Sequence, residues 1–273
     1  MILGLEYGFM RHALLAGSAI AVLSAAVGYF VTLRRQAFAA HALSHVGFTG
    51  AAGAILLGLS PYIGLFAFTL ASGVALALAG GRIRQRDIGI GMVLMFALGL
   101  GVLFLNLYTA NAQSAMSILF GSIVGITAGQ AWLSLGVGLA GLVALAVMFR
   151  PLCFASFNPE GAQARGVRLR WLDLGFIVLL AVTVAIAVPV IGALLIFALL
   201  IGPAAAAQVL SRSVVGGVVL SMLLGLAITW GGLAGSYALG YPASTWIASL
   251  SFVIYGLAHG WRRWRDGQAG PAG

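Results

Sequence analysis

Two histidines one helical turn apart are the residues of this sequence best suited to bind a ligand. His41 and His45 lie in a short, mostly apolar run. A spacing of four places both imidazoles on one face of a helix, and two such nitrogens can bind one divalent cation of the zinc type. We therefore expect His41 and His45 to contact a metal ion. We expect Ser44 and Thr49, in the same segment, to line the path that this ion follows.

The histidine pair also has a purely structural interpretation, in which neutral imidazoles bond to backbone carbonyls and pack helices together. Two imidazoles are too few for a closed metal site, so further ligands would have to come from other polar groups or from a second copy of the chain. Transport requires weak and exchangeable ligation, so an incomplete ligand set suits a pathway. The other two histidines, His12 and His259, lie beside arginines, and we expect both at the membrane interface.

The segments that hold these histidines are apolar. Of the 273 residues, 62% are hydrophobic and 7% are charged, whereas a soluble domain carries about 25% charged residues. This composition excludes a soluble globular enzyme and a disordered chain. The apolar runs are continuous and long enough for transmembrane helices, without the alternation of membrane strands. We predict an all-α polytopic transmembrane bundle, with residues 1–273 forming a single domain.

The net charge of +9 comes from arginine alone, because the chain has no lysine. The arginines form clusters between apolar runs, as the positive-inside rule predicts for cytoplasmic loops, and we therefore expect no nucleic-acid binding. Placing these clusters in the cytoplasm predicts about eight to nine spans, with breaks near Ser60–Pro61 and near Pro189, and leaves the side of the N-terminus open. Without lysine there is no Walker A site, so the chain does not hydrolyse ATP itself.

The longest polar interruption lies at about residues 157–170. Asn158 suits an N-cap, Pro159 the first helical position and Gly166 the end of a helix, and Glu160 in the first turn favours the helix dipole. These residues predict one short cytoplasmic helix that is capped at both ends. It is either a docking element for a soluble partner or a connecting loop with ordinary caps.

In combination, these segments resemble the permease subunits of the ABC-3 family of metal importers, which take up zinc, manganese or iron. Four matching segments occur in the family's order. They are residues 28–45, with Leu33-Arg34-Arg35 and Ala42-Leu43-Ser44-His45; Phe120-Gly121-Ser122-Ile123; residues 158–167, with Asn158-Pro159-Glu160, Ala162, Ala164, Gly166 and Val167; and the run from Ile191 to Ala205.

The resemblance implies a type II ABC importer permease in the bacterial cytoplasmic (inner) membrane. It implies three kinds of partner: a second permease copy, two cytoplasmic ATPase subunits and an extracytoplasmic metal-binding protein. The chain itself would be non-catalytic and would hold no permanent cofactor, since the metal is its cargo. The residues that the resemblance assigns to ATPase coupling are Asn158, Pro159, Glu160, Ala162, Ala164 and Gly166.

Three departures from the family pattern concern the cargo. The family's intramembrane aspartate falls at His41, a second aspartate falls at Gly240, and a threonine falls at Ala206. Exchanging carboxylates for an imidazole favours zinc over manganese or iron, so we expect Zn²⁺, with Mn²⁺ or Fe²⁺ import as the alternative. A permease for a metal chelate, such as a siderophore or cobalamin, and a stand-alone secondary transporter are further alternatives.

Overall fold

The computed structural model describes residues 8–79, 83–107, 121, 125–193 and 195–268. Every secondary-structure element in these ranges is a helix, which confirms the predicted all-α fold for this part of the chain. The helices are α1 (Gly8–Leu33), α2 (Ala37–Leu56), α3 (Pro61–Ala79), α4 (Ile83–Leu107), α6 (Ala128–Phe157), α7 (Pro159–Ala164), α8 (Leu169–Ile191), α9 (Ile196–Leu210), α10 (Val214–Leu239) and α11 (Ala243–Gln268).

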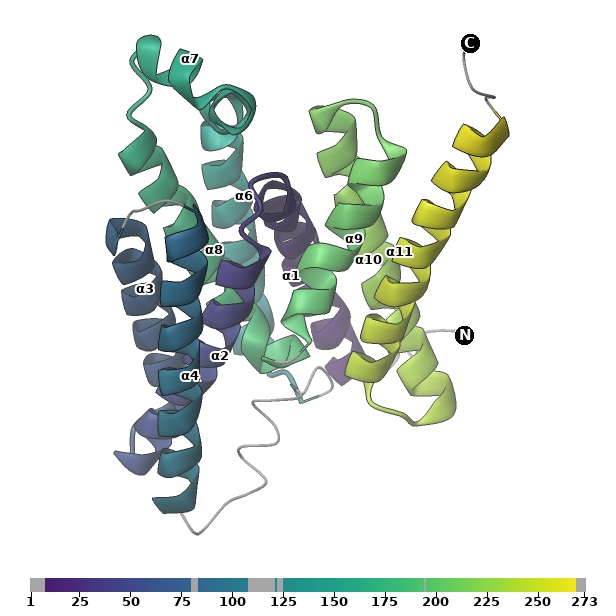
Figure 1. Ribbon diagram of the computed structural model, residues 1–273. Helices are drawn as coiled ribbons and strands as arrows, with labels where there is room; N and C mark the ends of the chain where they lie inside the picture. The colour runs from purple at the N-terminus through teal and green to yellow at the C-terminus, as the bar shows by residue number, and fades with distance from the viewer. Residues whose placement is uncertain (1–7, 80–82, 108–120, 122–124, 194, 269–273) are drawn as a thin grey trace.

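Three helices, α1, α6 and α8, lie between two outer groups (Figure 1). Helices α2, α3 and α4 pack together on one side, and α9, α10 and α11 pack together on the other. Most residues of α1 and α8 are buried, whereas α3 and α4 are largely exposed. The core therefore surrounds α1 and α8, and the outer helices offer their apolar side chains to lipid.

Glycine allows several of these helices to cross closely. Gly28 of α1 faces the backbone carbonyl of Leu200 in α9, where a Cβ atom would overlap that carbonyl. Gly50 of α2 and Gly64 of α3 face each other in the same way. Membrane helices use small residues at such crossings because van der Waals packing holds them together. Glycine at these positions therefore sets the spacing between helices.

The predicted number of spans is not confirmed. Six helices in the described ranges are long and apolar enough to cross a membrane, namely α1, α3, α4, α6, α8 and α10. Helix α2 carries the two histidines, α9 has only 15 residues, and the last turns of α11 contain arginines. The break predicted at Ser60–Pro61 is present, whereas the one expected near Pro189 lies at Gly192, with α8 continuing through the proline.

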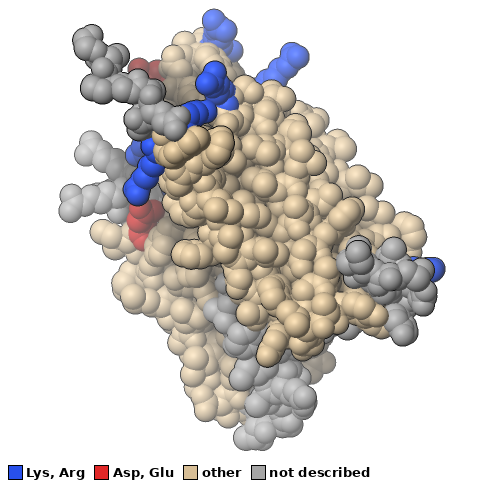
Figure 2. Space-filling model, turned by 90° about the vertical axis from the view of Figure 1, so that its right-hand side faces the viewer, with Lys and Arg blue, Asp and Glu red and all other residues tan. Residues whose placement is uncertain are grey.

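The arginine-bearing turns lie at one end of the bundle. The α1–α2 turn, α7, the α9–α10 turn and the end of α11 are at the top of Figure 1, and the α2–α3 and α10–α11 turns are at the bottom. Figure 2 shows the arginines of one face concentrated toward the end that carries α7. The positive-inside rule predicts that this end faces the cytoplasm.

Candidate metal pathway

Helix α2 places the two histidines side by side. Their ring centroids are 4.6 Å apart, and the ring planes are inclined by 81°. His45 is buried and His41 is partly buried. Among the described residues, neither Nδ1 atom has a hydrogen-bond partner, although both atoms are buried. Because an unpaired buried polar atom costs free energy, this arrangement favours ligand binding over a role in which Nδ1 bonds to a backbone carbonyl.

The histidine pair faces α9. The ring of His41 lies 5.2 Å from the ring of Phe197, measured between centroids. Phe197 is the second residue of α9, directly after the break that begins at Gly192. The fold thus brings the histidine-bearing helix against the start of a short, interrupted apolar segment. Interrupted helices near the midplane are typical of substrate pathways in transporters.

Ser44 and Thr49 are buried in the same helix, but their hydroxyls are engaged by backbone oxygens. Ser44 Oγ donates to the His41 carbonyl at 2.7 Å. Thr49 Oγ1 donates to the Ala97 carbonyl of α4 at 2.6 Å. Ser44 therefore stays in the turn between the two histidines, whereas the Thr49 hydroxyl is directed toward α4.

The described residues supply an incomplete ligand set for a metal ion. Across the described ranges, no three His, Cys, Asp or Glu side chains come together. Gly240 ends α10 in a left-handed conformation, with a φ of 72°, at the end of the bundle opposite α7. Ala206 is buried within α9. Neither residue has a side-chain oxygen in place of the family's aspartate and threonine, so a closed metal site would need ligands from elsewhere.

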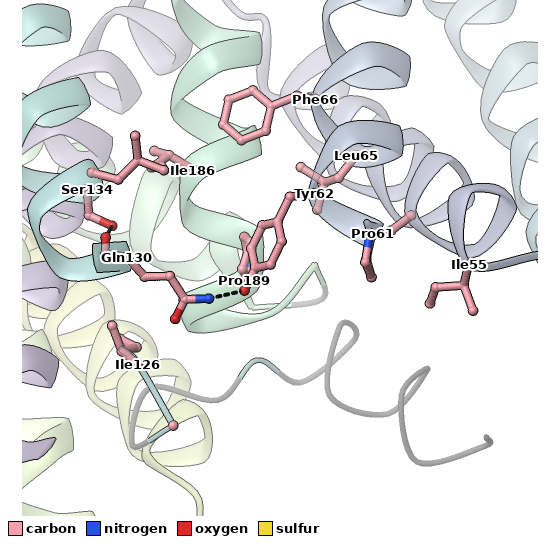
Figure 3. A pocket seen from close by; sticks show the side chains of 13 residues that line it. Ile55, Pro61, Tyr62, Leu65, Phe66, Ile126, Gln130, Ser134, Ile186 and Pro189 are labelled. Atoms are coloured by element: carbon pink, nitrogen blue, oxygen red, sulfur yellow. Dashed lines mark hydrogen bonds between the residues drawn. The ribbon is translucent and has the colours of Figure 1, made fainter. Parts of the chain in front are cut away.

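A separate cavity of about 410 Å³ lies between α2, α3, α6 and α8, toward the end opposite α7. Its Gln130 side chain is already hydrogen-bonded. Gln130 Nε2 donates to Tyr62 Oη (Figure 3), and Gln130 Oε1 accepts from the backbone N–H of Thr127 at 2.9 Å. The other lining residues are mostly apolar, and neither histidine is among them. This cavity is therefore poorly suited to a hydrated cation.

The predicted short helix is present as α7, with the expected caps. Asn158 Oδ1 accepts from the Gly161 backbone N–H at 2.8 Å, and Pro159 occupies the first turn. Gly166 follows the helix with a φ of 85°, and the Val167 N–H donates to the Ala162 carbonyl at 3.0 Å. This pattern is a Schellman motif.

Helix α7 lies across the end of the bundle (Figure 1). Ala162 is fully buried and anchors it, while Glu160 and Ala164 are exposed on its outer surface. A rigid, capped element exposed at this end has the geometry that a contact with a soluble partner requires.

An ion pair between the α1–α2 turn and α8 escapes prediction from the sequence. Arg34, in the turn after α1, pairs with Asp173 in the second turn of α8. The Arg34 guanidinium also lies over the ring of Phe176, 5.4 Å from its centroid. One signal for it exists in the sequence, because the chain has only five acidic residues and Asp173 begins a long apolar run. A carboxylate in that position signals a nearby cation.

Comparison with known proteins shows which family has this architecture. Residues 6–259 match the model of the ABC 3 transport family. The manganese import system permease protein ScaB of Streptococcus parasanguinis is 31% identical over 251 residues, covering 92% of this chain and 89% of that protein. The manganese transport system membrane protein MntC of Halalkalibacterium halodurans is 29% identical, covering 94% and 82% respectively.

Solved structures agree with the family match. PsaBC from Streptococcus pneumoniae, solved in complex with Fab, matches with a TM-score of 0.83 and 27% identity, covering 93% of this chain and 91% of that chain. An inward-facing conformation of a putative metal-chelate type ABC transporter matches with a TM-score of 0.72 at 19% identity, a likeness of fold alone. The family match spans nearly the whole chain, and the six apolar helices agree with it: the chain belongs to the ABC 3 transport family and is a multi-pass membrane permease of the metal ABC transporter class.

Proposed function

We propose that this chain forms the transmembrane pathway of an ATP-driven importer whose cargo is Mn²⁺. Two relatives that it matches over most of their length are named for manganese import or transport. The observation that carries the pathway role is the histidine pair, whose buried Nδ1 atoms have no partner within the described residues, while the choice of Mn²⁺ rests on these relatives. A divalent cation passing between α2 and α9 would find His41 and His45 as its ligands.

The manganese proposal replaces the zinc expectation as the main candidate. Zinc remains a second candidate because of one observation: His41 stands where the family pattern has an aspartate. Imidazole suits zinc, while manganese favours oxygen ligands. The two cargoes therefore differ in how strongly they depend on a nitrogen at position 41.

The same proposal includes the partners. Two ATPase subunits dock at the cytoplasmic end, where α7 exposes Glu160 and Ala164. An extracytoplasmic metal-binding protein delivers the cation at the other end, where the α2–α3 and α10–α11 turns lie. A second permease copy completes the membrane part and adds ligands to the incomplete set. ATP supplies the free energy, and the permease supplies a pathway that opens to one side at a time.

Uptake by the reconstituted complex tests this function. Proteoliposomes holding the permease and its ATPase subunits receive Mn²⁺ or Zn²⁺ with the binding protein outside and ATP inside. We expect ATP-dependent accumulation of Mn²⁺ that exceeds that of Zn²⁺. Faster accumulation of Zn²⁺ would favour the second candidate, and accumulation of either metal without ATP would contradict an ATP-driven importer.

A further inference from the structure

One ion pair joins the α1–α2 turn to the base of α8. The Arg34 guanidinium pairs with the Asp173 carboxylate across 139 residues of sequence. The Arg34 side chain is only 12% exposed and that of Asp173 is 36% exposed. The guanidinium plane also packs over Phe176. A partly buried arginine held by two partners has a fixed direction, unlike an arginine in an isolated surface ion pair.

A short connection joins α7 to α8, the helix that carries Asp173. Residues 165–168 alone separate α7 from α8, and the Val167 N–H bonds back to the Ala162 carbonyl at 3.0 Å. Ala162 itself is fully buried. This short, hydrogen-bonded connection cannot absorb a displacement of α7 as a long flexible linker would. Movement of α7 therefore reaches the first turns of α8.

A tight turn joins Arg34 to α2, the helix that carries the histidine pair. The α1–α2 turn is tight, because the Gln36 N–H bonds to the Val31 carbonyl at 2.8 Å and Arg35 has a φ of 55°. Helix α2 begins at Ala37, and His41 follows one turn later. A force applied to Arg34 is therefore passed to the start of the helix that carries the histidines.

We propose that the Arg34–Asp173 ion pair transmits movement of α7 to α2 and so positions the histidine pair during the transport cycle. Both residues are positioning residues, since neither belongs to the histidine pair that would contact the metal. Coupling between distant sites is carried by rigid elements joined through such contacts. The inference rests on the proposed function, because it requires an ATPase that acts on α7.

The test measures Mn²⁺ uptake and ATP hydrolysis in the same proteoliposomes, using the complete complex. We expect Asp173→Asn and Arg34→Gln to assemble and to hydrolyse ATP, while Mn²⁺ transported per ATP falls by about tenfold, as for loss of a coupling contact. Arg35→Gln is the matched control, because it removes the same charge from the neighbouring, exposed arginine. Its transport ratio should remain that of the unmodified complex.

The ratio of Mn²⁺ to ATP separates transmission from simple stabilisation. A contact that only stabilises the fold would change the amount of complex but leave the ratio unaltered, so an unaltered ratio in Asp173→Asn overturns the inference. If neither single variant assembles, Arg34→Lys decides, because it keeps the positive charge but loses the planar guanidinium that pairs with Asp173 and packs over Phe176. A lowered ratio in the assembled Arg34→Lys complex supports transmission, and an unaltered ratio overturns it.

The unmodified complex distinguishes failure of this inference from failure of the proposed function. An unmodified complex without ATP-dependent uptake would contradict the proposed function and, with it, the transmission role. Normal uptake by that complex, together with a normal ratio in Asp173→Asn, would contradict the transmission role alone.

Discussion

At the scale of single residues, the polar groups of α2 divide into two kinds. The hydroxyls of Ser44 and Thr49 donate to backbone carbonyls, which is how a membrane helix satisfies small polar side chains. The Nδ1 atoms of His41 and His45 are buried without a partner in the part of the chain that the structure describes. Ionisable side chains in a membrane segment are costly. The proposed function accounts for these two histidines as ligands of a passing cation.

Replacing His41 by aspartate should alter which metal is preferred. His41→Asp restores the oxygen ligand of the family pattern beside the imidazole of His45. Because manganese favours oxygen and zinc accepts nitrogen readily, we expect the ratio of Mn²⁺ to Zn²⁺ uptake to rise severalfold. Parallel uptake measurements with each metal in the reconstituted complex check this. A ratio that stays constant would show that position 41 does not contact the metal.

Sequence spacing predicts some residue contacts and not others. The 4.6 Å approach of His41 and His45 follows from a spacing of four on one helix. The direction of Thr49 depends on where α4 packs, which spacing along α2 does not encode. Arg34 and Asp173 are 139 residues apart in the sequence. The scarcity of charged residues marks each of them as notable, but it does not predict that they pair with each other.

At the scale of elements, α7 depends on its C-terminal glycine. Gly166 has a φ of 85° and open space around its α-carbon, so the cost of a side chain there is backbone strain alone. We expect Gly166→Val to unwind the end of α7 and to reduce co-purification of the ATPase subunits and ATP-driven uptake.

Gly58 offers a matched control for this variant. It has a φ of 71° and open surroundings, but it lies in the α2–α3 turn at the opposite end of the bundle. Gly58→Val imposes comparable strain and should leave the ATPase subunits bound. Equal co-purification from Gly166→Val and the unmodified chain would argue against docking at α7.

The α1–α9 crossing should tolerate no side chain at Gly28. A Cβ atom there would overlap the Leu200 carbonyl, so we expect Gly28→Ala to destabilise the fold by about 2 kcal/mol through overpacking. Gly99→Ala, on an exposed face of α4 with open space around it, should be neutral or stabilising because alanine favours helix by roughly 0.5–1 kcal/mol.

Thermal unfolding of the two purified variants in detergent checks this difference. The midpoint should fall for Gly28→Ala and hold for Gly99→Ala. Equal midpoints would mean that α1 and α9 can separate at this crossing without loss of stability.

Element boundaries follow the sequence where local chemistry sets them. The caps of α7 are local, so Asn158 and Gly166 mark its ends correctly. Pro189 misleads because membrane helices tolerate proline when neighbours satisfy the freed carbonyl. The residue that ends α8 is Gly192, which adopts a φ of 102°.

At the scale of the whole molecule, the arginine distribution predicts the orientation in the membrane. Single cysteines replacing Arg35 and Arg212 should react with an impermeant thiol reagent only from the cytoplasmic side. Cysteines replacing Gly58 and Tyr241 should react only from outside. Labelling is measured in a Cys153→Ala background, since Cys153 is the sole native cysteine. Reaction of Arg35→Cys and Arg212→Cys from opposite sides would contradict this orientation.

The pathway role of the histidine pair is tested most directly by ATP-dependent metal uptake in a complex that carries both His41→Ala and His45→Ala. The unmodified complex and the His259→Ala complex serve as references, since His259 is near the end of α11 and outside the pair. We expect the double variant to assemble with its ATPase subunits while uptake of Mn²⁺ and of Zn²⁺ falls to the level seen without ATP. Uptake near that of the His259→Ala complex would contradict the pathway role and leave His41 and His45 as packing residues.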